Sequence, residues 1–205
     1  MATTRTPRIG WINAGLRALA AAGPDAVRIE SLAQALGVSK GGFYWHFDGR
    51  PALLKEMLDQ WERVMVDEVI ERVEEEPSRD ARAKLHRLFA LASDRSQPGS
   101  AHDPDEPSPM GIELAIRDWA RRDQGVAARL VHVDNRRMEY MRKLFRDLCS
   151  DEDEVEVRCL LAFFVFVGNH FIAADHGAHS RAEILQLILE RLLEDPAEVA
   201  NRRPD

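Results

Sequence analysis

The sequence predicts an all-α protein of about nine helices, and three observations carry that prediction. Apolar residues recur at spacings of three and four along nearly the whole chain, no segment alternates as a β-strand does, and Gly or Pro separates the helical segments. Hydrophobic residues make up 45% of the chain and charged residues 31%, as in soluble globular proteins. The longest uncharged run begins at Cys159, and its purely apolar part reaches about half of the ~20 residues that a membrane helix needs. We therefore expect a buried helix there and no membrane span.

The first 50 residues are predicted to hold three helices and two breaks. Apolar spacing supports a helix at Ile9–Ala22, which Gly23-Pro24 ends. A short second helix begins at Ile29 and ends at Gly37, and a third is expected at Ser39–Phe47.

The rest of the chain repeats this pattern with longer helices. We expect them at Pro51–Glu75, Arg79–Asp94, Met110–Arg122, Gly125–Leu148, Glu152–Asp175 and Ser180–Leu193. Four prolines within 95–109 predict a loop, and 201–205 form a polar tail. We divide the chain into a domain at 1–50 and a body at 51–205, joined by the helix at 51–75.

Charge is unevenly distributed between these two parts. Residues 1–50 contain six basic and three acidic residues, whereas the whole chain carries a net charge of −7. A basic head on an acidic body suggests a polyanionic partner for the head, although ordinary surface charge would give the same count. Cys149 and Cys159 are too far apart for a CxxC pair, and the chain opens without a secretory signal. We therefore expect reduced thiols and a cytoplasmic protein.

The segment from Ile29 to Phe47 is the most informative. Ala33 is small enough for a close crossing of two helices, and Gly37, four residues later, can adopt the left-handed conformation that ends a helix. Ser39 can cap the next helix, and Phe43 with Phe47 can anchor it, because residues four apart share one face. This spacing is typical of a helix-turn-helix, whose second helix enters the major groove of DNA.

The exposed face of that second helix is predicted to contact the nucleic acid. Two glycines, Gly41 and Gly42, destabilise a helix by about 1 kcal/mol each relative to alanine, so their presence suggests close approach to a ligand. Lys40 has the only long basic side chain in the first turn, and we expect it to contact a guanine. A helical hairpin in an unrelated bundle is the alternative interpretation.

The run Phe43-Tyr44-Trp45-His46-Phe47, followed by Arg50, Leu53 and Leu54, resembles the DNA-binding head of TetR-family transcriptional regulators. The resemblance covers the first 60 residues. It implies that Tyr44 and His46 contact phosphates, together with Arg50, where the family usually has lysine. Gly42 departs from the family, which often has Thr or Ala there. The predicted DNA-binding residues are Arg28, Ser39, Lys40, Gly41, Gly42, Tyr44, Trp45, His46 and Arg50.

For the body, the resemblance implies a dimer formed through the last two helices and an effector pocket in each protomer. Candidate pocket residues are apolar or aromatic: Trp61, Met65, Phe89, Met110, Leu114, Trp119, Tyr140, Phe163 and Phe166. Each could equally be ordinary core. The expected dimer contacts lie on the last helix: Ile184, Leu185, Ile188 and Leu192.

Three functions remain open from the sequence. The first is a ligand-responsive repressor that binds a palindromic operator as a homodimer, with the helix at 51–75 coupling effector and DNA. The second is a DNA-binding regulator without a small-molecule effector. The third is a metal-dependent enzyme that uses His170, His176 and His179, but no phosphate loop or nucleophile–base pair supports it. We expect no enzymatic activity, cofactor or metal.

Overall fold

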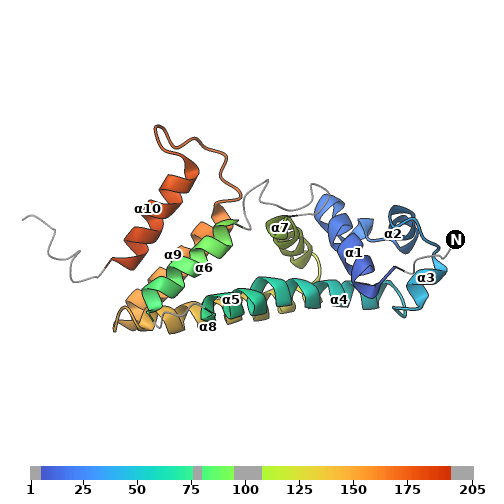
Figure 1. Ribbon diagram of the computed structural model, residues 1–205, viewed down its shortest axis with the longest axis horizontal. Coiled ribbons are helices and arrows are strands. Elements are labelled where there is room, and N and C mark those ends of the chain that lie inside the picture. Colours follow the sequence, from blue (N-terminus) through green and yellow to red (C-terminus); the bar gives the residue numbers. More distant parts are fainter. Residues whose placement is uncertain (1–5, 76–79, 95–107, 195–205) are drawn as a thin grey trace, which may run out of the picture. The chain divides into compact units, whose positions relative to one another are not determined.

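The computed structural model describes residues 6–75, 80–94 and 108–194, and all regular elements in this part of the chain are helices (Figure 1). It contains nine helices when α4, η2 and α5, which follow one another without a break, are counted as one, and no strand. The all-α prediction is therefore confirmed. The tail at 201–205 lies outside the described residues, as does the predicted loop at 95–109 except for its last two residues.

Internal contacts divide the chain into two compact units. Of the described residues, unit 1 contains 6–68 and 108–133, and unit 2 contains 69–75, 80–94 and 134–194. Unit 1 thus combines the predicted head with segments that we assigned to the body. The functional division at residue 50 stays a prediction.

The helix boundaries agree with the sequence to within a few residues in most cases. Unit 1 contains α1 (Arg8–Ala22), the 3-10 turn η1 (Pro24–Ala26), α2 (Ile29–Ala35), α3 (Gly41–Tyr44), α4 (Arg50–Glu62), the π-helical segment η2 (Arg63–Asp67), α7 (Pro109–Ala120) and the first part of α8 (Gln124–Arg146). Unit 2 contains α5 (Glu68–Glu74) except for its first residue, α6 (Ala81–Asp94), the remainder of α8, α9 (Glu152–Gly168) and α10 (Arg181–Leu193).

In unit 1, α1 packs against both α4 and α7. Trp11 and Leu19 of α1 and Leu53 of α4 are fully buried. Gly15 allows the close approach of α1 to α4, because a Cβ added there would lie 2.6 Å from Sδ of Met57. The absence of a side chain at this position therefore sets how closely the two helices pack.

The predicted helix at Pro51–Glu75 is present, but a π-helical segment interrupts its α-helical geometry. Four of its buried residues, Leu53, Met57, Trp61 and Met65, are spaced by four. Because an α-helix has 3.6 residues per turn, such a stripe drifts around the helix. The π segment, with more residues per turn, reduces this drift and keeps Met65 on the buried side.

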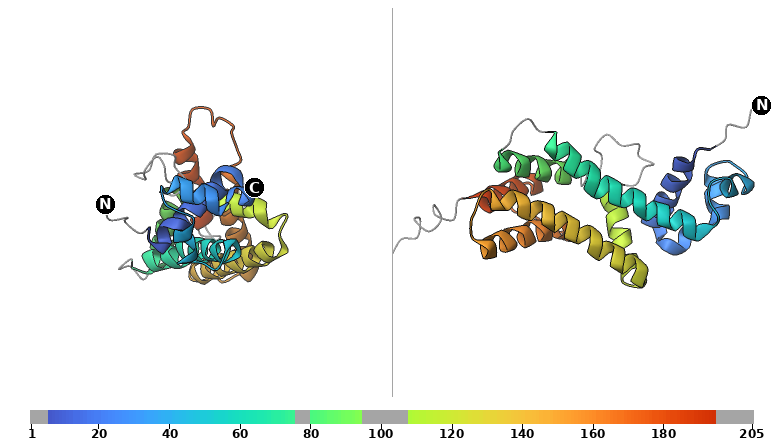
Figure 2. Two further views of the ribbon diagram at one scale, coloured as in Figure 1. Left: turned by 90° about the vertical axis from the view of Figure 1, so that its right-hand side faces the viewer. Right: turned by 90° about the horizontal axis from the view of Figure 1, so that it is seen from below.

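In unit 2, α10 packs against α6 and α9, shown in red, green and orange in Figure 2. Leu85, Phe145 and Val155 are at the centre of its core and are fully buried. Cys159 belongs to the same core, and burial raises the pKa of its thiol to about 12. A thiol in this environment stays protonated and unreactive.

The predicted helix at Glu152–Asp175 is too long, because α9 ends at Gly168. The side chain of Arg181 explains the early end. Its guanidinium donates to the carbonyl oxygens of Asn169 at 2.7 Å and Ile172 at 2.6 Å, and so binds backbone groups of the chain that follows α9. Gly177 then turns the chain at a φ of 64°.

Candidate functional site

The turn between α2 and α3 forms as the sequence predicts. Gly37 has a φ of 66°, and the amide of Val38 donates to the carbonyl of Ala33 at 3.0 Å, which closes the end of α2. Ala33 is buried, as a close helix crossing requires. The local geometry is therefore that of a helix-turn-helix.

The second helix of this motif is shorter than the predicted Ser39–Phe47. Regular α-helix covers Gly41–Tyr44 only, and turns flank it on both sides. The hydroxyl of Ser39 does not cap it; instead the backbone carbonyl of Ser39 accepts from the amide of Gly42 at 3.0 Å. Because two glycines disfavour helix, the segment is held by side-chain anchors rather than by its own propensity.

Those anchors are Phe43 and Phe47, both buried, as predicted. Their rings stack with centroids 5.1 Å apart, and Trp11 of α1 meets Phe43 edge-on at 5.4 Å. Tyr44 and Trp45 point the other way and are 54% and 76% exposed. The aromatic run thus alternates between core and solvent, which places two large side chains on the outer face.

Glycine at positions 41 and 42 has no explanation within the protein. A Cβ built on Gly41 or Gly42 would meet no other atom closer than 3.7 Å. Alanine would fit at both positions in the absence of a ligand. The structure is consistent with the prediction that the glycines allow another molecule to approach the backbone.

Lys40 precedes α3 and is exposed, but its ammonium group forms an ion pair with Glu30 of α2. Their hydrogen bond lowers the pKa of Glu30 and raises that of Lys40. The sequence analysis missed Glu30, because a partner ten residues upstream follows from the turn and not from helical spacing. The predicted contact of Lys40 with a guanine must therefore compete with this carboxylate.

The three other polar candidates of the head contact backbone carbonyls. Arg50 donates from Nε to Val27 at 2.8 Å and from a terminal nitrogen to Pro24 at 2.6 Å. His46 lies 3.0 Å from the carbonyl oxygen of Thr6, and exposed Arg28 donates to that of its neighbour Asp25 at 3.1 Å. Their phosphate contacts stay predictions, and Arg50 acquires a structural role that the sequence did not indicate.

The nine candidate effector residues fall into two sets. Trp61, Met65, Met110, Leu114 and Trp119 belong to unit 1, and Phe89, Tyr140, Phe163 and Phe166 belong to unit 2. In unit 1 all but Leu114 are buried. Their assignment to an effector pocket stays a prediction.

One member of the unit 1 set, Trp61, contacts a buried carboxylate that the sequence analysis missed. Glu113 of α7 is fully buried, accepts from Nε1 of Trp61 at 2.8 Å and pairs with Arg117 one turn later at 2.9 Å. Its i,i+4 spacing from Arg117 was the only signal in the sequence. The two partners offset the cost of burying this charge.

In unit 2, Tyr140 belongs to the core, and Phe89 and Phe163 are partly buried against it. The hydroxyl of Tyr140 donates to Glu74 at 3.0 Å, and burial together with this carboxylate raises the pKa of Tyr140. Phe163 and Phe166 of α9 lie with ring centroids 6.2 Å apart.

The predicted dimer contacts on α10 differ in exposure. Ile184, Leu185 and Ile188 are half-buried, whereas Leu192 is buried in the core of unit 2 and is largely unavailable to a partner. A broader apolar surface lies on α9, where four large side chains at helical spacing are about half exposed: Val157, Leu160, Leu161 and Phe164. The sequence predicted that α9 contributes to the dimer but not which of its faces is uncovered.

The histidine cluster does not assemble a metal site within the described residues. No group of three or more His, Cys, Asp or Glu side chains there could hold a metal ion. The Nε2 atoms of His170 and His176 are buried and unpaired, and burial, with Arg181 nearby, lowers the pKa of His170. Among the described helices, none combines the length and apolarity needed to cross a membrane.

Comparisons with known proteins agree with this geometry. Residues 12–57 match the family model for bacterial regulatory proteins of the tetR family. No curated protein sequence matches the chain. A transcriptional regulator from Rhodococcus sp. Rha1 has a similar structure, with a TM-score of 0.66, 17% identity, and coverage of 92% of this chain and 94% of the other. The regulator AibR, in complex with isovaleryl coenzyme A and operator DNA, gives a TM-score of 0.65 at 12% identity, with coverage of 91% and 97%.

Proposed function

Since residues 12–57 match the family model for bacterial regulatory proteins of the tetR family, we propose that this chain is a ligand-responsive repressor of that family. It binds a palindromic operator as a homodimer and is released when a small molecule occupies the body of each protomer. The uncovered face of the recognition segment carries the proposal. Lys40, Tyr44 and Trp45 are exposed there around two glycines that nothing inside the protein requires.

The roles of the DNA-facing residues follow from their chemistry. Lys40 can donate to guanine O6 and N7 in the major groove, and this contact specifies sequence. Tyr44, His46 and Arg50 contact phosphates, which positions the protein without reading bases. Glycine at 41 and 42 lets the backbone approach the DNA closely.

The apolar stripe on α9 supports the homodimer. Contiguous exposed apolar surface of this kind marks interaction sites in soluble proteins. A two-fold dimer places two heads on one palindrome, which supplies the affinity that a single head lacks. Phe164→Glu or Leu185→Glu should yield monomers that lose operator binding.

The buried residues of unit 1 support an effector site near Trp61 and Met65. Linkage then requires operator and effector to weaken each other's binding by the same factor, typically about 5- to 150-fold. The likeness to AibR makes acyl-coenzyme A thioesters one compound class to screen. If no ligand stabilises the protein, the alternative of a DNA-binding regulator without a small-molecule effector is favoured.

Selection from a random pool of DNA duplexes tests the proposal. The wild-type protein should recover an inverted repeat, and Lys40→Ala should relax one base position in each half-site. Arg122→Gln is the matched control, because Arg122 is an exposed arginine of the same unit, paired with Asp118. Failure of the wild type to enrich any sequence would refute sequence-specific DNA binding. A thermal-shift screen and titration of a hit with and without the selected duplex test the effector.

A further inference from the structure

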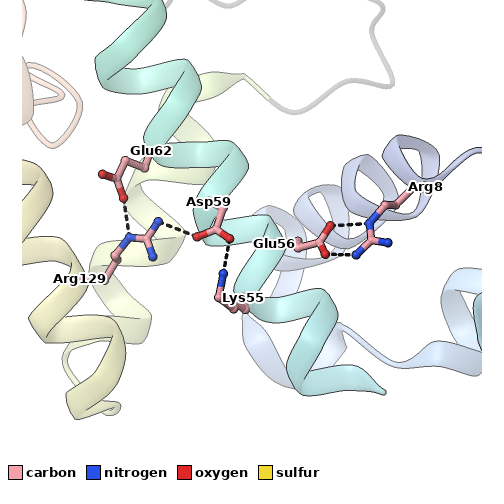
Figure 3. Close-up of polar contacts among 6 residues, drawn as sticks. All are labelled: Arg8, Lys55, Glu56, Asp59, Glu62 and Arg129. Atoms are coloured by element: carbon pink, nitrogen blue, oxygen red, sulfur yellow. Dashed lines mark hydrogen bonds and ion pairs between the residues drawn. The ribbon is translucent and has the colours of Figure 1, made fainter. Parts of the chain in front are cut away.

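Three acidic residues of α4 are each paired with an arginine from another helix of unit 1 (Figure 3). Glu56 accepts from Nε of Arg8 on α1 at 2.8 Å. Asp59 accepts from a terminal nitrogen of Arg129 on α8 at 2.7 Å, and Glu62 pairs with Nε of the same guanidinium. A single arginine therefore bridges two carboxylates of α4.

This bridge is better protected than an ordinary surface ion pair. The side chain of Arg129 is 30% exposed and that of Glu62 is 11% exposed. Burial acts to raise the pKa of Asp59, but hydrogen bonds from Lys55 and Arg129 outweigh it and leave that pKa lowered. Nε2 of His132 lies 3.5 Å from Glu62 as a further neighbour. Loss of Arg129 would leave the nearly buried carboxylate of Glu62 without its guanidinium partner, which is costly.

The other arginine, Arg8, links α4 to the recognition segment. The guanidinium of Arg8, paired with Glu56, lies 4.8 Å from the centroid of the Phe47 ring. Phe47 in turn stacks on Phe43 of α3. A continuous series of contacts within unit 1 therefore runs from α8 through α4 and α1 to the DNA-facing segment.

We infer that Arg129 is a positioning residue for operator binding, because it fixes α4, and through α4 the recognition segment, to the first part of α8. The inference rests on the proposed function and adds a residue outside the DNA-facing surface. Two heads can bind one palindrome only if their recognition segments are correctly spaced. Residues in a contact network of this kind change coupling between sites without touching either ligand.

The test compares Arg129→Gln with Arg122→Gln on two duplexes, one with the inverted repeat that the wild type selects and one with a single half-site. Arg129→Gln should weaken binding to the full repeat by about 2- to 30-fold and change half-site binding by less than about 2-fold. A merely structural role would reduce the folded fraction and weaken both equally. Arg122→Gln should leave both unchanged.

Two further measurements keep the outcome decisive. The double variant Glu62→Gln, Arg129→Gln should lose less binding free energy for the full repeat than the two single variants lose in sum, because both residues act through one ion pair. Hydrogen exchange without DNA should be faster in α4 and α1 for Arg129→Gln and unchanged for Arg122→Gln. If the wild type selects no sequence, the proposed function fails, and hydrogen exchange still tests the bridge. Two results would overturn the inference. One is hydrogen exchange in α4 and α1 of Arg129→Gln that is as slow as in the wild type, and the other is an equal loss of affinity for both duplexes.

Discussion

Arg50→Ala should destabilise the DNA-binding head as well as weaken its binding to DNA. The guanidinium donates to the carbonyls of Val27 and Pro24, which lie in the connection between α1 and α2. Alanine removes both donors, so the carbonyl of Val27 must hydrogen-bond water, whereas that of Pro24 keeps the amide of Val27 at 3.2 Å. The change thus acts on the turn that positions α2, at a distance of more than 20 residues in sequence.

The magnitude follows from the two contacts. A hydrogen bond to a charged group contributes about 1.5–3 kcal/mol when protected. Arg50 is only half-buried, so hydrogen bonds to water offset part of the loss. We therefore expect the free energy of unfolding to fall by about 2 kcal/mol for the two hydrogen bonds together. This corresponds to a change of about 30-fold in the folding equilibrium constant.

Urea unfolding and hydrogen exchange of residues 24–35 measure this effect. Arg50→Lys separates the two roles, because lysine keeps a charge for a phosphate but cannot reproduce the planar fork that serves two carbonyls. Arg28→Ala is the control, since within residues 6–75, 80–94 and 108–194 the Arg28 side chain hydrogen-bonds only the carbonyl of the neighbouring Asp25. If Arg50→Ala unfolds like the wild type and only lowers the salt slope of DNA binding by about one unit, the structural role is wrong.

Three other changes test separate parts of the molecule. Glu30→Gln should free Lys40 and raise affinity for random duplexes more than for the selected repeat, which competition binding measures; an unchanged ratio contradicts this. Glu56 and Asp59 have lower pKa values in the folded protein, so their contribution to stability is present above about pH 4 and is lost as the pH falls further; urea unfolding at pH 7 and pH 3 checks it, and equal stability would refute it. Phe164→Glu should shift the protein from dimer to monomer in sedimentation, and a wild-type monomer at micromolar concentration would contradict the dimer.

Local spacing was enough to predict the fold class and the turn of the recognition motif. Gly37 and the pair Phe43–Phe47 obey rules that involve only neighbours along one or two helical turns. The length of α3 was predicted less well, because anchoring by Phe43 and Phe47 does not require regular helix across the whole segment. The end of α9 was missed because it depends on Arg181, which lies 13 residues beyond Gly168.

Contacts to backbone and between distant helices were beyond the reach of the sequence. Arg50 donates to backbone carbonyls, which every residue has, so no residue type in the sequence marks them as its acceptors. Trp61 and Glu113 are 52 residues apart, and Arg129 is 67 residues from Glu62. Only the fold brings such partners together. The sequence therefore predicted Trp61 as an apolar pocket residue but did not predict its buried acidic partner, Glu113.

The contact of His46 with the backbone restricts how this side chain can hold a phosphate. A carbonyl oxygen can only accept, so the Nε2 that faces Thr6 carries the hydrogen. In the neutral ring Nδ1 then has a lone pair and cannot donate to a phosphate oxygen. While the neutral ring keeps the Thr6 carbonyl it has no donor left for DNA, so a phosphate contact requires the ring to release that carbonyl and turn Nε2 toward the phosphate. The predicted phosphate contact of His46 therefore competes with the contact that this side chain makes to the residues before α1.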